Sequence, residues 1–377
     1  MENQKPERLG SLDVLRGFDL FCLVFFQPVF TKLAEVMDWP FTNWLATKFE
    51  HVHWEGFVFW DLIMPLFLFM AGASMPFAFS KYLKSGTKSQ LYKRVLKRVL
   101  ILWVFGMMCQ GNLLSFDPDQ IYFFSNTLQS IAIGYLVSAV LLMHFQRNWQ
   151  IIITSTFLLV YWALMMFVRA GDFGGGDFTP DHNLAEFVDR VVLGRFRDRA
   201  TVGETGVIFA ESYRYTWILS SLNFAVTVMT GVFAGQILKG NASKINKIKY
   251  LVLGGICMIL AGQLWGLQMP VIKKIWTSTM TLYSSGICFL LMAFFYFLID
   301  YKNYGKYLNW LKIYGMNSIL AYMLIEIVNF TSVTHSLFHG VEQYIGNYYE
   351  VLIRLGNVSI VFVILLLMYR KRIFLKV

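Results

Sequence analysis

The densest group of side chains capable of chemistry lies between residues 50 and 61, where His51 and His53 stand among Glu50, Glu55 and Asp61. Histidine titrates near neutral pH and serves as a general base when a neighbouring carboxylate orients its ring. A His-x-His pair can also bind a metal, but no third ligand follows at a usual spacing, so we expect no metal. Spacing alone favours a third interpretation, a belt of interfacial histidines and aromatic residues.

A second charged group opens the first long apolar run. Asp13 and Asp19 each lie three residues from Arg16, and at about 100° per residue both carboxylates flank the guanidinium on one helix face. Gln27, eleven residues beyond Arg16, returns to nearly the same face. One interpretation is a salt bridge near the cytoplasm that fixes helix packing. The other is that Arg16 helps to bind an anionic ligand.

Polar residues also stand inside later apolar runs, among them Asn126, Gln129, Asn317 and Glu326. Amides in such places usually form hydrogen bonds between helices. An acid there is costly and indicates a functional site by default. Glu326 is therefore as open to a functional interpretation as to a structural one.

The elements that must position these residues are membrane helices. The chain of 377 residues is 56% hydrophobic and 15% charged, whereas soluble domains are about a quarter charged. A span needs about 20 apolar residues. We predict one all-α domain over residues 1–377, a polytopic transmembrane helix bundle of about ten spans. The predicted spans are 11–33, 56–80, 91–113, 124–146, 149–169, 217–239, 249–268, 276–299, 312–330 and 352–370.

Loop charges predict the orientation of the bundle. Every charged residue in the segment 81–98 is Lys or Arg, as is every charged residue in 239–249, and both segments should be cytoplasmic. Both termini then lie in the cytoplasm. The longest loop, about 170–216, lies outside and contains a short amphipathic helix from Asn183 to Leu193. Since the basic residues sit between apolar runs, the net charge of +10 does not indicate a nucleic-acid partner.

Six motifs in order resemble one family of membrane enzymes. The run Arg8–Asp19 resembles the opening of the heparan-α-glucosaminide N-acetyltransferase family. The block His51-x-x-Trp54-x-Gly56, continuing to Asp61-Leu62-Ile63-x-Pro65, resembles its most distinctive stretch. The other four resemblances are at Leu128–Tyr135, Asn183–Arg190, Pro270–Thr277 and Gly315–Ile319. Together they extend over nearly the whole chain.

The resemblance implies an acetyltransferase that uses cytosolic acetyl-CoA and acetylates an amino sugar or glycan across the membrane. The family's catalytic histidine matches His51 and not His53. Asp61 would orient the site, and Gln27 is the polar residue nearest to an asparagine that assists catalysis in the family. The resemblance further implies a bacterial inner-membrane protein in contact with membrane lipid and a possible homodimer.

Two further sets of residues are candidates for binding. The CoA moiety is assigned to Arg16, Lys97, Arg98, Asn126 and Gln129. The acceptor is assigned to Trp54, Glu55, Lys273, Lys274, Trp276, Asn317 and Glu326. The alternative is a transporter or flippase for a sugar or lipid-linked saccharide, which would also need an intramembrane acid and a polar cavity. Transporters often show paired halves with matching interrupted helices, and we find no such halves in the sequence.

Overall fold

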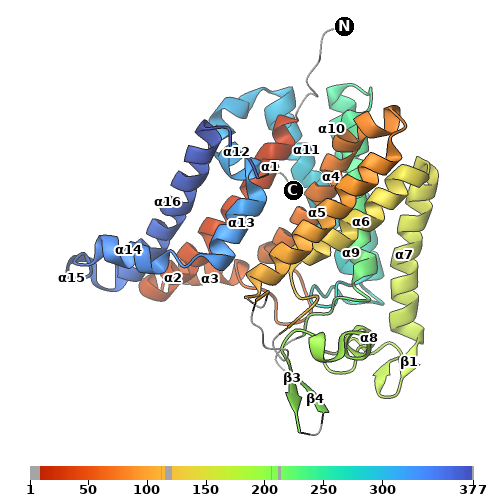
Figure 1. Ribbon diagram of the computed structural model, residues 1–377, viewed down its shortest axis with the longest axis horizontal. Helices are drawn as coiled ribbons and strands as arrows, with labels where there is room; N and C mark the ends of the chain where they lie inside the picture. Colours follow the sequence, from red (N-terminus) through yellow and green to blue (C-terminus); the bar gives the residue numbers. More distant parts are fainter. Residues whose placement is uncertain (1–8, 112, 115–120, 205, 211–213, 376–377) are drawn as a thin grey trace. The chain divides into compact units, whose positions relative to one another are not determined.

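The computed structural model describes residues 9–111, 113–114, 121–204, 206–210 and 214–375. Most of its regular structure is helical, which confirms the predicted all-α class (Figure 1). The described residues fall into two compact units. Unit 1 lies within Met1–Val52, Val58–Ile63 and Phe294–Lys376, and unit 2 within His53–Phe57 and Met64–Ala293. That these units form one functional domain stays a prediction.

Unit 1 is built from both ends of the chain. Its helices are α1 (Gly10–Phe21), η1 (Cys22–Phe26), α2 (Gln27–Met37), α3 (Pro40–Lys48), η2 (Phe59–Leu62), η5 (Phe297–Tyr301), η6 (Tyr304–Leu308), α12 (Asn309–Met316), α13 (Ser318–Ile327), α14 (Thr331–Phe338), α15 (Glu342–Ile345), η7 (Gly346–Tyr348) and α16 (Tyr349–Arg370). Helix α1 packs against α12 through small residues. A Cβ atom on Gly17 would overlap the carbonyl oxygen of Leu311, and one on Gly315 would overlap that of Asp13. Such close backbone approach is typical of helix pairs in membranes.

The first predicted span is one continuous helix with a widened turn. Between α1 and α2 the backbone forms the π-helical turn η1, and Pro28 follows at the start of α2. Proline supplies no N–H to the preceding turn, and its ring clashes with the carbonyl four residues earlier. A π turn relieves that clash, and such turns are frequent at functional sites.

Unit 2 contains the middle of the chain. Its helices are α4 (Ile63–Lys84), α5 (Lys88–Cys109), α6 (Thr127–His144), α7 (Arg147–Phe167), α8 (Leu184–Leu193), η4 (Gly194–Phe196), α9 (Ser221–Lys239), α10 (Lys244–Trp265) and most of α11 (Ser278–Tyr296). Helices α4 and α9 lie in close contact, since a Cβ atom on Gly72 would overlap Val228 O and one on Gly231 would overlap Phe69 O. This pair is thus held together by the same small-residue packing.

The loop predicted to lie outside, about 170–216, is more ordered than the sequence indicates. Helix α8 confirms the predicted short helix, and Asn183 caps it by accepting from the N–H of Glu186 at 2.9 Å. Two antiparallel hairpins were not predicted: β1 (Arg169–Ala170) with β2 (Phe173–Gly174), and β3 (Ala200–Gly203) with β4 (Gly206–Phe209). Residues 205 and 211–213 of this loop lie outside the described part of the chain.

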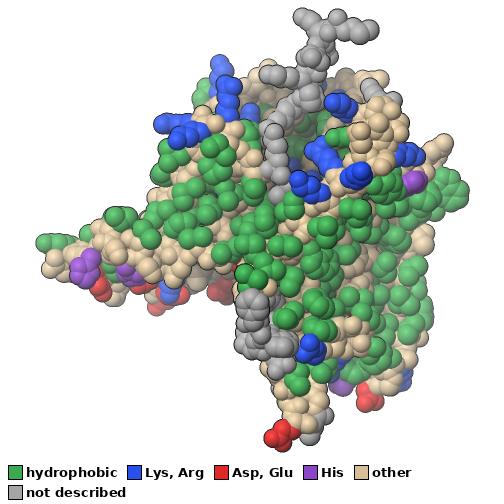
Figure 2. Space-filling view, viewed as in Figure 1, with side chains coloured by type: hydrophobic (Ala, Val, Ile, Leu, Met, Phe, Trp, Pro, Cys, Tyr) green, Lys and Arg blue, Asp and Glu red, His purple; other side chains and the backbone are tan. Residues whose placement is uncertain are grey.

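Eight helical stretches among the described residues are long and apolar enough to span a membrane. The other two predicted spans also form helices. The segment 91–113 falls on α5, whose first half is basic, and 312–330 falls on α12 and α13, which are interrupted at Asn317. Figure 2 shows hydrophobic side chains over most of the visible face of each unit and Lys and Arg side chains at one end of each. Each unit therefore has the surface of a membrane-embedded bundle.

Candidate active site

The side chains of His51 and Asp61 lie in contact in unit 1. The Nδ1 atom of His51 is 2.7 Å from Oδ1 of Asp61, and the backbone N–H of Val58 donates to the other carboxylate oxygen at 3.1 Å. The Asp61 side chain is buried, whereas that of His51 is 37% exposed. A buried carboxylate therefore holds an imidazole whose ring is open to the surroundings.

Aromatic packing fixes the segment that carries His51. Phe49 is buried just after the end of α3, and its ring stacks on Phe26 of η1 at 5.3 Å and meets Trp60 of η2 edge-on at 6.0 Å. The ring of His51 lies 6.4 Å from that of Trp60. Asp61 belongs to the 3-10 turn η2, which leads directly into α4. Asp61 is thus held by the turn that precedes α4, and the segment before His51 is held by the packing of Phe49.

This geometry suits a histidine that handles protons. With the proton of the neutral ring on Nδ1 and directed at the carboxylate, the basic nitrogen is Nε2. A carboxylate in this position fixes both the tautomer and the orientation of the ring. The pair can therefore serve as a general base, or as a nucleophile through Nε2.

Gln27 and Arg16, the two candidates in the first span, lie elsewhere in unit 1. Gln27 follows Phe26, the residue whose ring stacks on Phe49, but no hydrogen bond joins its amide to another described residue. Arg16 pairs with Asp13, with Nη1 3.7 Å from Oδ1. Asp19 lies in the same helix as Arg16, three residues further on, but it is fully buried, and no hydrogen bond or ion pair joins its carboxylate to another described residue.

Four of the residues assigned to the acceptor are brought together in unit 2. Glu55 forms an antiparallel β-bridge with Ile272, and the N–H of Gly56 donates to Val271 O at 2.8 Å. Trp54, one residue earlier, donates through Nε1 to Phe178 O at 2.9 Å. This pairing sets Trp54 and Glu55 beside the stretch that carries Lys273 and Lys274. Their role in binding an acceptor stays a prediction.

Trp276, the fifth of this set in unit 2, is buried and has a positive φ of 50°, which is rare for a residue with a side chain. Its Nε1 donates to Thr227 Oγ1 at 3.2 Å, and its carbonyl accepts from Asn223 Nδ2 at 2.7 Å. Strained backbone persists only where the surroundings over-determine it and often marks a functional segment.

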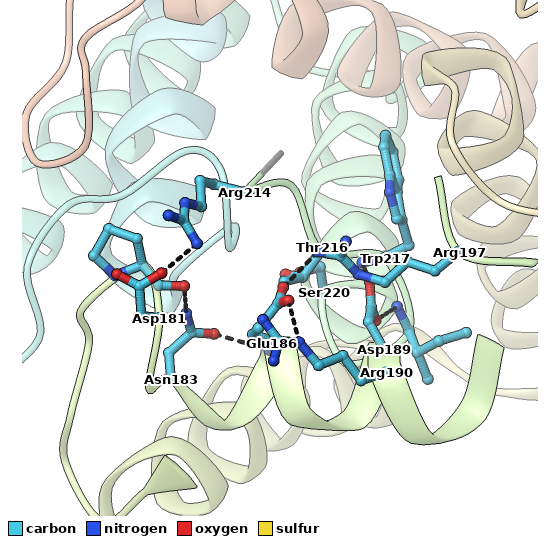
Figure 3. Close-up of polar contacts among 12 residues, drawn as sticks. Asp181, Asn183, Glu186, Asp189, Arg190, Arg197, Arg214, Thr216, Trp217 and Ser220 are labelled. Carbon is cyan, nitrogen blue, oxygen red and sulfur yellow. Dashed lines mark hydrogen bonds and ion pairs between the residues drawn. The ribbon is translucent and has the colours of Figure 1, made fainter. Parts of the chain in front are cut away.

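A polar framework anchors α8 to the segment that leads into α9 (Figure 3). Asp189 accepts from the N–H groups of Trp217 at 2.8 Å and Ile218 at 2.9 Å. Burial raises the pKa of Asp189 to about 7, although these two hydrogen bonds and the charge of Arg197 oppose the rise. Glu186 binds both Arg190 and the fully buried Arg197. The motif Asn183–Arg190 includes most of α8, but its helical periodicity does not predict that the acids Glu186 and Asp189 are buried.

The other candidates are held in structural contacts or lie at the basic end of unit 2. Asn126 and Gln129 cap α6, where Oδ1 of Asn126 accepts from Leu128 N and Oε1 of Gln129 accepts from Ser125 N, each at 2.8 Å. Lys97 is exposed on α5, and the guanidinium of Arg98 lies 4.3 Å from the ring centre of Tyr135. That these four bind CoA stays a prediction.

Asn317 and Glu326 lie apart within unit 1. Asn317 is buried and clamps the C-terminal segment, since its Nδ2 donates to Ile373 O at 3.0 Å and its Oδ1 accepts from Leu375 N at 2.9 Å. Glu326 lines a cavity together with Arg354. Sequence reasoning missed Arg354, although an arginine inside the apolar run 352–370 was the signal that could have found it.

These features define the class as a multi-pass α-helical membrane protein in which a buried aspartate holds an exposed histidine. The family model described as "Heparan-alpha-glucosaminide N-acetyltransferase, catalytic" matches residues 8–182, a range that includes both members of the pair. These findings confirm the resemblance to this family that the motifs predict.

Two curated relatives extend the likeness beyond the range of the family model. The human heparan-alpha-glucosaminide N-acetyltransferase is 25% identical over 378 residues, covering 85% of this chain and 53% of the relative. The mouse protein of the same name is 24% identical over 373 residues, covering 85% and 54%. The chain therefore spans about half the length of the curated relatives that it matches.

Proposed function

We propose that the chain is a membrane-bound acetyltransferase that moves an acetyl group from acetyl-CoA to the amine of an amino sugar or glycan. The observation that carries this proposal is the contact of 2.7 Å between His51 and Asp61, inside the range that the acetyltransferase family model matches. Names of the two relatives support N-acetyl transfer as the reaction. His51 is the catalytic residue of the proposal, and Asp61 is its positioning residue.

The proposed chemistry uses the nitrogen of His51 that faces away from Asp61. Acetyl-CoA supplies a thioester carbonyl and a thiolate leaving group. Nε2 accepts a proton from the acceptor amine while the amine nitrogen bonds to the carbonyl carbon. The C–S bond then breaks, and the proton passes from Nε2 to the thiolate sulfur. In the second version Nε2 attacks the carbonyl carbon and the C–S bond breaks to release the thiolate; the amine then attacks the acetyl carbon, the bond to Nε2 breaks, and the amine proton passes to the thiolate. Asp61 stabilises the positive charge that the ring gains in either version.

The charge pattern supports a direction for the transfer. Lys93, Arg94 and Lys97 are exposed on α5 and would attract the phosphates of CoA. By the positive-inside rule this segment faces the cytoplasm, where acetyl-CoA is made. The proposal therefore places the donor in the cytosol, the acceptor in the periplasm, and the protein in a bacterial inner membrane with both termini in the cytoplasm.

A purified preparation with a matched histidine control tests the proposal. The full chain in detergent is incubated with acetyl-CoA labelled in the acetyl group and a panel of amino sugars, as wild type, His51→Ala and His53→Ala. His53 is exposed and forms no hydrogen bond or ion pair with another described residue, so its replacement controls for loss of a nearby imidazole. We expect His51→Ala to lower the rate by about 10²-fold or more and His53→Ala to leave it within about twofold.

Two outcomes contradict the proposal. Equal rates for the two histidine variants would remove His51 from the chemistry. Uptake of an amino sugar into vesicles without any turnover of acetyl-CoA would favour a transporter instead. Rescue of His51→Ala by added imidazole would support a base in solution taking the place of the side chain.

A further inference from the structure

Unit 1 contains a cavity of about 300 Å³ whose lining includes neither His51 nor Asp61. It lies among α13, α14 and α16 and the junction of η1 with α2. This volume is at the lower end of the range of about 300–1,000 Å³ found for small-molecule sites. The cavity is therefore large enough for a compact polar group.

The cavity and the His51 segment lie on opposite faces of one helix. Val24 and Pro28, one turn apart, line the cavity. Phe26 and Phe30, also one turn apart, stack on Phe49, two residues before His51, at 5.3 and 5.9 Å. The residues of the second pair are each two positions after those of the first, and two positions correspond to a rotation of about 200° around a helix, so the two pairs lie on opposite faces. The cavity is thus a second site, separate from the candidate active site.

Most polar groups in the cavity wall are already engaged with one another. Asn329 Oδ1 accepts from the N–H of Thr331 at 3.1 Å. The amide of Asn357 accepts from Thr334 at 2.6 Å and donates to the Thr331 hydroxyl at 3.1 Å. These bonds tie α14 to α16 and make that part of the wall rigid.

The two charged groups of the wall are different. Glu326 and Arg354 form no hydrogen bond or ion pair with any other residue that the structure describes, including each other. A charge at the membrane usually pairs with an opposite charge or faces a polar cavity. A cavity with one unmatched carboxylate and one unmatched guanidinium is complementary to a ligand that carries both a cation and an anion.

The position of the charges indicates where that ligand comes from. Glu326 is the next-to-last residue of α13, and Arg354 is about 8 Å along α16 from its first residue, so both lie near helix ends. The ends of membrane-spanning helices lie near the headgroups of a bilayer. Ile327 and Val328 are each 42% exposed beside Glu326 and offer an apolar surface to acyl chains.

We propose that this cavity binds an aminophospholipid headgroup, with the ammonium at Glu326 and the phosphate at Arg354. Arginine binds phosphate oxygens through two parallel N–H groups, and the carboxylate accepts hydrogen bonds from the ammonium. The same chemistry would admit a free zwitterion such as phosphoethanolamine. This assignment does not depend on acetyl transfer, so either proposal can fail without the other.

Native mass spectrometry of the full chain tests the assignment. Purified protein in detergent is mixed with equal amounts of phosphatidylethanolamine and phosphatidylglycerol, and the bound lipid is identified by its mass. The variants are Glu326→Gln and Arg354→Gln. Glu350→Gln is the control, because Glu350 is exposed in the first turn of α16 and outside the cavity lining.

Wild type and Glu350→Gln should each retain one phosphatidylethanolamine, at about tenfold higher occupancy than phosphatidylglycerol. Each cavity variant should lose about tenfold of that occupancy, and either variant alone suffices if the other does not fold. Equal binding of both lipids by wild type, or unchanged selectivity in both cavity variants, would overturn the assignment. Excess phosphoethanolamine separates the two sources: displacement of the lipid supports the free zwitterion, and its retention supports the lipid.

Discussion

At the scale of single residues, Asp61 serves two partners at once. One carboxylate oxygen holds the ring of His51, and the other accepts from the N–H of Val58 at the start of η2. The same side chain therefore shapes the helix entry and orients the imidazole. Its burial means that neither contact is shared with water, which keeps both directions fixed.

Asp61→Asn should separate orientation of His51 from folding. An amide can turn its NH₂ toward Nδ1, which then accepts, so the ring proton moves to Nε2 and the basic nitrogen is lost. We expect kcat to fall by about 10²-fold or more while KM for acetyl-CoA stays within about threefold. Initial rates over a range of acetyl-CoA concentrations measure both constants. An equal loss in Asp61→Asn and Asp61→Ala with a large rise in KM would instead indicate a role in binding.

The sequence predicted this pair only in part. His51 and Asp61 are ten residues apart, and the sequence motif predicts a role for each of them. None of residues 49–62 is α-helical, so helical periodicity could not show that the side chains meet. Phe49, two residues before His51, packs against Phe26, which lies more than 20 residues earlier in the chain. Long-range packing of this kind leaves no local pattern in a sequence.

At the scale of elements, the apolar runs predicted nearly every long helix, because hydrophobic length is a strong signal. They could not predict where a run breaks. The run 312–330 is interrupted at Asn317, whose amide is directed at the backbone of Ile373 and Leu375 instead of its own helix. The short hairpins around α8 were missed as well, since strands of two to four residues show little alternation.

Asp189 gives the loop between α7 and α9 a dependence on pH. Burial raises its pKa to about 7 in the folded protein, above the ordinary value of about 3.9. Between about pH 4 and pH 7 the folded state therefore binds more protons than the unfolded state, and the free energy of unfolding falls as pH rises. The contribution is fully present below pH 4 and is lost above pH 7.

Asp189→Asn should remove this dependence. An amide cannot accept from both Trp217 and Ile218, so Tm should fall at every pH. The difference in Tm between wild type and variant should be larger at pH 5 than at pH 8, by about 3 °C or more. Thermal unfolding in detergent at both pH values measures it. Asp181→Asn is the control, because Asp181 is 56% exposed and Arg214 is its one ion-pair partner among the residues that the structure describes. If the difference in Tm is the same at pH 5 and pH 8, Asp189 is not the group whose titration changes the stability.

At the scale of the whole molecule, orientation in the membrane decides which substrate reaches which end. The sequence predicts it from loop charge alone, since Lys and Arg between spans stay on the cytoplasmic side. The predicted cytoplasmic segment 81–98 and the predicted outer loop 170–216 each contain exposed positions, Ser85 and Asp172, that can report their side. If the first span ran the other way, the donor and acceptor sides of the proposed reaction would both be reversed.

Labelling of single cysteines tests this orientation directly. The four native cysteines, Cys22, Cys109, Cys257 and Cys288, are first replaced by Ala, and Ser85→Cys or Asp172→Cys is then added. A membrane-impermeant maleimide should label Asp172→Cys in cells with an intact inner membrane and Ser85→Cys only after lysis. Gel shifts before and after lysis give the two labelled fractions, and acetyl transfer by the cysteine-free parent shows that it is folded. The reverse labelling pattern would show that the orientation in the membrane is opposite to the predicted one. The basic segment 81–98 would then face away from the cytosol, which contradicts binding of cytosolic acetyl-CoA at that segment.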